Sequence, residues 1–103
     1  MKFEKIRFHG KHEFTRNTVH QIMNQIDDMY PGNDLSPTRV NRYVEILLDD
    51  QDFNPKTHVF YDKNTNRKLT HDFLANIAYQ YILEHLDEFK KNNNFLMVKD
   101  NLL

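Results

Sequence analysis

The segment from Asp72 to Phe89 constrains the fold most, because its apolar residues cover more of a helix than a surface helix needs. At about 100° per residue, most of them share one broad face. The apolar arc spans roughly 240°, whereas a surface helix needs little more than about 100°. Its members are Leu74, Ile77, Ala78, Tyr81, Ile82, Leu86 and Phe89, with Tyr79 and Leu83 at one side. We therefore expect this helix either at the centre of its own domain or with one edge against a partner.

The composition is that of one folded domain. The chain has 103 residues, 39% hydrophobic and 13% aromatic, which is enough apolar material for a modest core. A charged share of 28% with two Gly and three Pro argues against disorder. The absence of Cys excludes disulfides and thiolate metal sites. No signal peptide and no run of about 20 apolar residues is visible, so we expect a cytoplasmic protein without a membrane partner.

The N-terminal half predicts two strands and two helices. Residues 2–8 are expected to form a strand, and residues 12–14 a second short one. A helix over residues 18–30, capped by Asn17 or Thr18, is expected to stop at Pro31-Gly32. Ser36-Pro37 predicts the start of a second helix, which continues to about Asp50. Its expected buried face comprises Val40, Tyr43, Val44, Leu47 and Leu48, widened by Ile46, with an Arg42–Glu45 pair on the solvent side.

The C-terminal half predicts a hairpin and a long helix. Residues 53–55 are expected to form a connection, residues 58–61 a strand, 62–66 a turn and 67–70 the returning strand. The long helix is expected to begin at Thr70 or His71 and to end near Lys90-Lys91, with an edge strand over 95–98. The predicted fold is therefore a single α+β domain over 1–103. In it, three helices pack on a small antiparallel sheet and the long C-terminal helix is central.

The sequence contains few residues whose spacing indicates a catalytic or metal-binding site. His9 and His12 lie beside Glu13, but a zinc site needs three or four converging ligands. A small ribonuclease could be built around His58 and His71, although a nuclease of this size is usually more basic than a chain of net charge −1. We expect no enzymatic activity, no metal and no cofactor.

DNA binding is the more specific alternative. Helices over 18–30 and 37–49 followed by a hairpin over 58–70 resemble pieces of a winged helix. That resemblance implies a dimeric DNA-binding transcriptional regulator with contacts from Arg39, Arg42, Lys63, Arg67 and Lys68. Residues 31–35 are too short for the extra helix of that fold, and acidic residues flank the second helix. Nucleic acid is therefore the second choice of partner.

Protein contact is the preferred function. Tyr79, Leu83 and Leu86 lie at the far edge of the apolar arc, at about one-turn spacing, and Tyr with Leu suits an interface core. We expect these three residues to bind a protein partner or a second copy of the chain. The function would then be that of a small regulator, inhibitor or accessory factor. Twelve Asn and more Lys than Arg hint at an AT-rich genome, such as that of a phage or mobile element acting on a host or defence protein.

Overall fold

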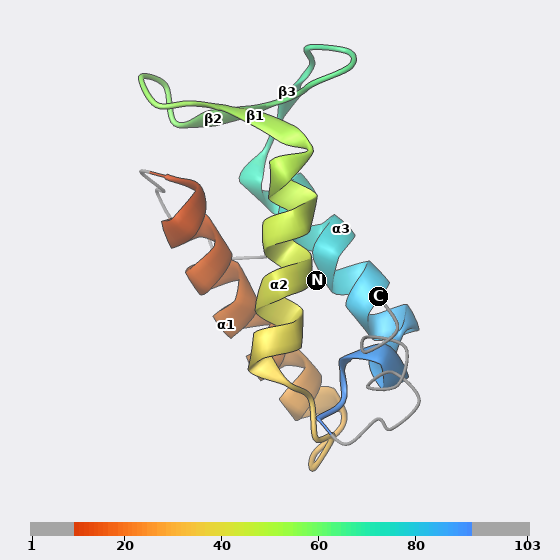
Figure 1. The fold of residues 1–103 in the computed structure, drawn as a ribbon. Helices are drawn as coiled ribbons and strands as arrows, with labels where there is room; N and C mark the ends of the chain where they lie inside the picture. The colour runs from red at the N-terminus through yellow and green to blue at the C-terminus, as the bar shows by residue number, and fades with distance from the viewer. Residues whose placement is uncertain (1–9, 92–103) are drawn as a thin grey trace.

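The computed structural model describes residues 10–91 and places them in one α+β arrangement (Figure 1). Its helices are α1 (Lys11–Met29), α2 (Pro37–Asp49) and α3 (His71–Glu84), followed by a 3₁₀ helix, η1 (Leu86–Phe89). Its strands are β1 (Gln51–Asn54), β2 (Val59–Asp62) and β3 (Lys68–Leu69), antiparallel in the order β1-β2-β3. The predicted fold class is confirmed. The strands expected over 2–8 and 95–98 lie outside the described residues.

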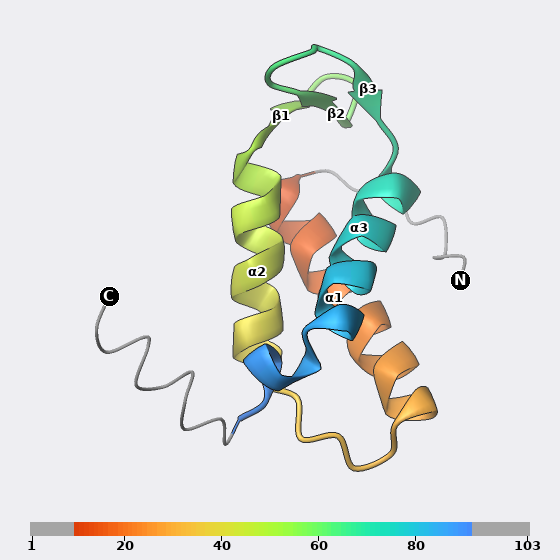
Figure 2. The ribbon, with the colours of Figure 1, turned by 90° about the vertical axis from the view of Figure 1, so that its right-hand side faces the viewer.

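The sheet sits at one end of the helices. Figure 2 shows α2 and α3 running side by side in opposite directions, with α1 behind them and the strands beyond the end where α2 stops and α3 begins. The inner side of the sheet closes the core through Phe60, whose ring meets that of Phe14 on α1 at 5.3 Å between centroids. Apolar residues from all three helices fill the rest of the core.

Helix α1 begins much earlier than expected. Residues 12–14 are its first turn rather than a strand, and residues 18–30 are only its later part. The physical reason is that helical periodicity already starts at Phe14, which is buried together with Thr15, Thr18 and Val19. The Thr15 hydroxyl also donates a hydrogen bond of 2.9 Å to the Lys11 carbonyl, as a helical hydroxyl can. The expected stop before Pro31 is confirmed, because α1 ends at Met29.

Helix α2 begins as its sequence predicts. The Ser36 hydroxyl accepts a hydrogen bond of 3.2 Å from the Arg39 amide, and Pro37 occupies the first turn. Val40, Val44 and Leu48 are buried, as expected. Ile46 does not widen that buried face. It is 54% exposed, because its position points away from the three buried residues.

The hairpin contains one strand more than expected. Residues 51–54 form β1, whereas 53–55 were expected to be only a connection. Phe53 pairs with Phe60 across the strands, and the Asn54 side chain closes the turn that follows by accepting a hydrogen bond of 2.8 Å from the Lys56 amide. The second turn is confirmed. There Asn66 adopts a left-handed conformation with φ of 57°, which Asn tolerates better than most residues.

Helix α3 starts at the predicted cap but ends early. The Thr70 hydroxyl accepts a hydrogen bond of 3.1 Å from the Phe73 amide. The α-helix stops at Glu84 rather than near Lys90, because the His85 backbone leaves helical geometry and η1 carries Leu86 and Phe89 back to the core. At 14 residues α3 is shorter than α1, which has 19, and it contacts both α1 and α2.

Candidate functional site

Three aromatic rings stack on one another where α2 meets the lower half of α3. The Tyr43 and Tyr81 rings are nearly parallel, 10° apart in orientation, with centroids 4.5 Å apart. His85 stacks on the other side of Tyr81 at 4.2 Å. Its Nδ1 donates a hydrogen bond of 2.8 Å to the Tyr81 carbonyl, which fixes the imidazole. We call these three residues the aromatic ladder.

The ladder is held in place from below by η1. The Phe89 ring meets Tyr43 edge-on at 5.7 Å and Tyr81 edge-on at 6.1 Å. Phe89 is itself buried, and its carbonyl accepts a hydrogen bond of 2.7 Å from the Ser36 amide just before α2. The segment that follows α3 is therefore tied to the start of α2, and the ladder rests on a rigid base.

Exposed apolar side chains also lie on α2 and α3 between the ladder and the sheet. Because α2 and α3 are antiparallel, one turn from Tyr43 leads to Ile46 and one turn from Tyr81 leads to Ile77. Ile46 is 54% exposed, Ile77 38% and Tyr81 37%. We call Tyr43, Ile46, Ile77 and Tyr81 the seam patch. On α3, Ile77 and Tyr81 lie roughly opposite Tyr79, whose hydroxyl contacts Met29 on α1.

The phenols of the seam patch stay neutral at physiological pH. Burial raises the pKa of Tyr43, and the neighbouring Tyr81 raises it further. The pKa of Tyr81 is also raised, first by burial and then by the Glu88 carboxylate, which accepts a hydrogen bond of 3.4 Å from its hydroxyl. The rim nearby is charged, since Lys90 and Asp87 form an ion pair at 3.1 Å. The patch thus combines neutral aromatic faces with a polar border.

Of the residues expected to form the partner edge, Tyr79 and Leu83 lie on the opposite side of α3 from Tyr81, and Leu86 begins η1. Tyr79 is only 4% exposed, and its hydroxyl donates a hydrogen bond of 3.1 Å to the Met29 sulfur on α1. Helix α1 therefore covers Tyr79, whose ring is buried rather than presented at the partner-binding edge expected from the sequence. Leu83 and Leu86 are partly buried and pack against the core. The exposed edge of α3 instead carries Ile77, Tyr81 and His85. Their four-residue spacing in the sequence is the signal that could have identified this edge.

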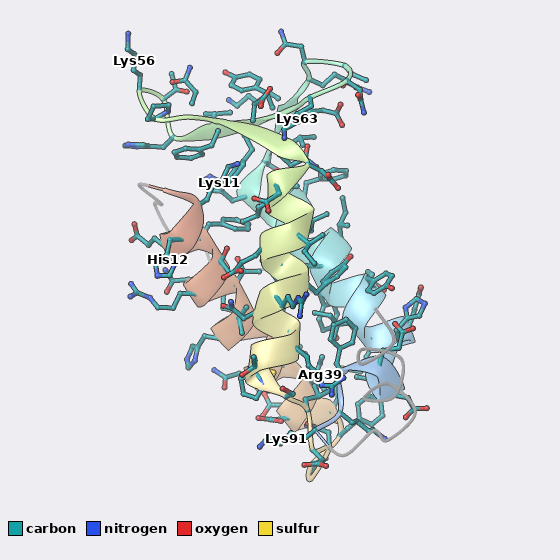
Figure 3. The ribbon with its side chains drawn as sticks, in the orientation of Figure 1. Lys11, His12, Arg39, Lys56, Lys63 and Lys91 are labelled. Atoms are coloured by element: carbon teal, nitrogen blue, oxygen red, sulfur yellow. The ribbon has the colours of Figure 1, made fainter. Side chains whose placement is uncertain are left out.

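The cations expected to contact DNA fall into two groups. Figure 3 places Arg39 and Lys63 at opposite ends of α2. Arg42 is one turn further along α2 and still about 10 Å from the end of that helix. The structure brings Lys63, Arg67 and Lys68 together on the hairpin, where the Lys63 ammonium donates a hydrogen bond to the last carbonyl of α2, that of Asp49. The expected cations therefore do not form one continuous surface.

The histidines considered for catalysis are arranged for packing. The His71 ring packs against Phe14 and Phe60, with centroids 5.4 and 5.8 Å away. Its Nε2 donates a hydrogen bond of 3.2 Å to the backbone carbonyl of His58 rather than to a side chain. Burial lowers the pKa of His71, which favours the neutral ring at physiological pH.

The searches for a metal site and a membrane-spanning helix among the described residues, and for similar proteins, found none of them. Within residues 10–91, no group of three or more His, Cys, Asp or Glu side chains is placed to hold a metal ion. None of the described helices has the length and apolar character needed to cross a membrane. No protein-family model, no curated protein and no solved structure matches the chain.

Proposed function

We propose that this is a non-enzymatic binding protein that acts through protein–protein contact, as a small regulator, inhibitor or accessory factor. The observation that supports this proposal is the seam patch with its aromatic ladder. The edge originally expected, formed by Tyr79, Leu83 and Leu86, is replaced in the proposal by the opposite edge of α3. The origin from a phage or mobile element stays a prediction from composition.

The chemistry of the seam patch suits a protein interface. Tyrosine is enriched at the centre of interfaces and among the residues that contribute most to binding. A ring already stacked between neighbours, as Tyr81 is, loses little conformational freedom when a partner covers it. Ile46 and Ile77 add aliphatic surface whose removal from water favours association by about 25 cal/mol per Å². The partner is a protein or a second copy of this chain.

The proposal is tested by placing a charge on the patch. Ile46→Lys and Ile77→Lys each put an ammonium group on a partly exposed position, so we expect the chain to stay folded and its association to weaken at least tenfold. Asn24→Lys is the matched control, because Asn24 is exposed on α1 and points away from α2 and α3. Sedimentation over a concentration series measures self-association. Pull-downs treated with nuclease identify a protein partner, which is then purified and titrated against each variant.

Two outcomes would count against the proposal. One is that the two patch variants and Asn24→Lys associate equally well with the purified partner and with themselves. The other is that every partner is lost on nuclease treatment and the patch variants leave that binding unchanged, which would show that nucleic acid rather than the seam patch makes the contact. A circular dichroism melt of each variant ensures that lost binding is not lost folding.

Binding of duplex DNA remains the second candidate function, after protein–protein contact. The net charge of −1 and the separation of Arg39 from the hairpin leave no broad cationic surface for a DNA groove among residues 10–91. We expect only non-specific binding of duplex DNA at physiological salt. Tight, sequence-selective binding that is weakened by Arg39→Ala, Arg42→Ala and Arg67→Ala would reverse this ranking.

A further inference from the structure

We propose that the outer end of the hairpin binds a single-stranded polynucleotide across its β2–β3 turn, residues 63–67. Two shallow hollows flank this turn. One, of about 690 Å³, is lined by Lys56, Tyr61 and Asn66 among others. The second, of about 480 Å³, is lined by Arg67, Lys68 and Phe73 among others. This site is separate from the seam patch and does not depend on it.

The two hollows share the turn as their common border. Asn66 lines the first hollow, and its neighbours Thr65 and Arg67 line the second. A chain laid over the turn therefore meets both hollows in succession. A polynucleotide has this form, with one base after another along a continuous backbone.

Aromatic residues line both hollows, Phe53 and Tyr61 the first and Phe73 the second. Tyr61 is partly exposed on the outer side of the sheet, directly opposite Lys68 on β3. Phe73, in the first turn of α3, is 51% exposed, although most phenylalanines in a domain of this kind are buried. Exposed aromatic rings on a surface that also carries cations are the elements with which proteins hold single-stranded nucleic acid, since every base can stack on them.

The charges of the chain are distributed in favour of an anionic ligand at this end. Residues 51–70 contain four Lys or Arg against two Asp, whereas the other described residues contain six Lys or Arg against eleven Asp or Glu. Lys56, Arg67 and Lys68 are exposed. Of the two acids, Asp52 lies beside Tyr61 on β1, while the Asp62 carboxylate turns into the β2–β3 turn. Phosphate groups would therefore find more cationic partners here than elsewhere on the described surface.

Both turns of the hairpin are already closed without a ligand. The Asp62 carboxylate accepts hydrogen bonds of 2.8 and 2.9 Å from the Asn64 and Thr65 amides. The Asn54 side chain does the same for the preceding turn, and Lys63 anchors the hairpin to the end of α2. A preformed surface loses little conformational entropy on binding, so even few contacts can contribute to affinity.

The combination favours a single strand over other polyanions. A duplex keeps its bases stacked inside, where Tyr61 and Phe73 cannot reach them, whereas single strands expose their base faces. An acidic peptide would use the cations but has no need of two separated aromatic rings. RNA and DNA strands share the chemistry required, and the experiment distinguishes them.

The test measures fluorescence anisotropy of labelled 12-nucleotide oligo-dT and oligo-U against the full chain, with a 12-base-pair duplex and polyglutamate as competitors. We expect saturable binding of at least one oligonucleotide, weakening with salt, and weak competition by duplex and polyglutamate. The tighter of the two oligonucleotides identifies RNA or DNA as the ligand. Lack of saturable binding to both at low salt would overturn the proposal.

Variants separate stacking from charge. Tyr61→Ala and Phe73→Ala should each weaken binding roughly tenfold, whereas Tyr61→Phe should retain it because its ring still stacks. Replacing both Arg67 and Lys68 with Ala should lower the slope of log affinity against log salt by about 1.4. Lys91→Ala is the matched control, because Lys91 is exposed and lies at the end of the molecule opposite the hairpin (Figure 3).

The aromatic variants also decide whether the surface is more than a cationic patch. Equal binding by Tyr61→Ala, Phe73→Ala and the unchanged chain would refute base stacking, and with it the proposal. Strong competition by polyglutamate would do the same. Phe73→Ala keeps the test valid if Tyr61→Ala unfolds, because Phe73 is largely exposed and its ring can be removed without opening the core.

Discussion

The Tyr43 ring on α2 lies flat against the Tyr81 ring on α3, with centroids 4.5 Å apart. Helix α3 is separated from α2 in sequence by the whole hairpin, so this stacking joins two distant parts of the chain at an exposed seam. The Tyr43–Tyr81 pair therefore has two roles. It fixes one helix against the other, and it presents an ordered aromatic surface.

The first prediction concerns the free energy of that pair. Tyr43→Ala and Tyr81→Ala should each destabilise the chain. In a double-mutant cycle, we expect a coupling energy of about 0.5 to 1.5 kcal/mol, the range measured for aromatic pairs. Urea unfolding of the four proteins in the cycle provides the measurement. Additive losses, with no coupling outside error, would mean that the stacking does not stabilise the fold.

The second prediction concerns Tyr79. Because α1 buries its ring, Tyr79→Ala should lower the free energy of unfolding by about 3 to 5 kcal/mol, as large-to-small changes at buried aromatics do. Tyr79→Phe keeps the ring and loses only the contact of the hydroxyl with the Met29 sulfur, so it should cost less than about 1 kcal/mol. Chemical denaturation distinguishes the two. A Tyr79→Ala chain as stable as the original would contradict the burial of Tyr79 against α1.

The third prediction concerns the pH dependence of stability through His71. Burial lowers its pKa in the folded chain below the ordinary 6.5, so the unfolded chain binds a proton more readily. The free energy of unfolding should therefore fall as pH decreases through about 6.5 and level off below the folded-state pKa. His71→Gln retains a donor for the His58 carbonyl but cannot titrate. Thermal melts at pH 7 and pH 5 should show a smaller loss for this variant than for the original chain.

The fourth prediction concerns the Asp62 turn. Hydrogen bonds from the Thr65 and Asn64 amides lower the pKa of its carboxyl below its ordinary value of 3.8. This group therefore contributes stability above its unfolded pKa, and the contribution is lost as pH falls through the lower folded value. NMR titration should show the amide resonances of Asn64 and Thr65 moving together at that low pKa. In Asp62→Asn those resonances should not titrate, and a titration midpoint above 3.8 in the original chain would contradict the turn geometry.

Local signals predicted those elements whose boundaries are decided by a few neighbouring residues. Ser36-Pro37, Thr70 and Pro31-Gly32 mark helix ends because caps and proline act through the backbone next to them. The β2–β3 turn is of the same kind. Its Asn66 adopts the left-handed conformation that the Asn-rich segment suggested.

Boundaries that depend on distant contacts escaped prediction. Residues 12–14 were expected to form a short strand. Phe14 nevertheless belongs to the helix, since its ring meets Phe60, far along the chain. Similarly, β1 is defined by its pairing with β2, which no pattern within Phe53-Asn54-Pro55 reveals.

The candidate site illustrates the same limit. The sequence correctly indicates that the helix after Thr70 carries more apolar residues than one side can bury. It could not tell which edge its own chain covers, because Tyr79 and Tyr81 are equally apolar in sequence. The contact of Tyr79 with Met29, fifty positions apart, decides that question.

The hairpin is joined to its neighbouring helices with almost no slack. Only Asp50 separates α2 from β1, and only Thr70 separates β3 from α3. Each helical residue turns the chain by about 100°, so one residue inserted or deleted at either joint would rotate the adjoining helix out of phase. Tyr81 would then no longer face Tyr43. The length of these two joints thus fixes how α2 and α3 are rotated relative to each other. Insertions or deletions at the joints should therefore be tolerated less well than insertions or deletions in the exposed turns of the hairpin.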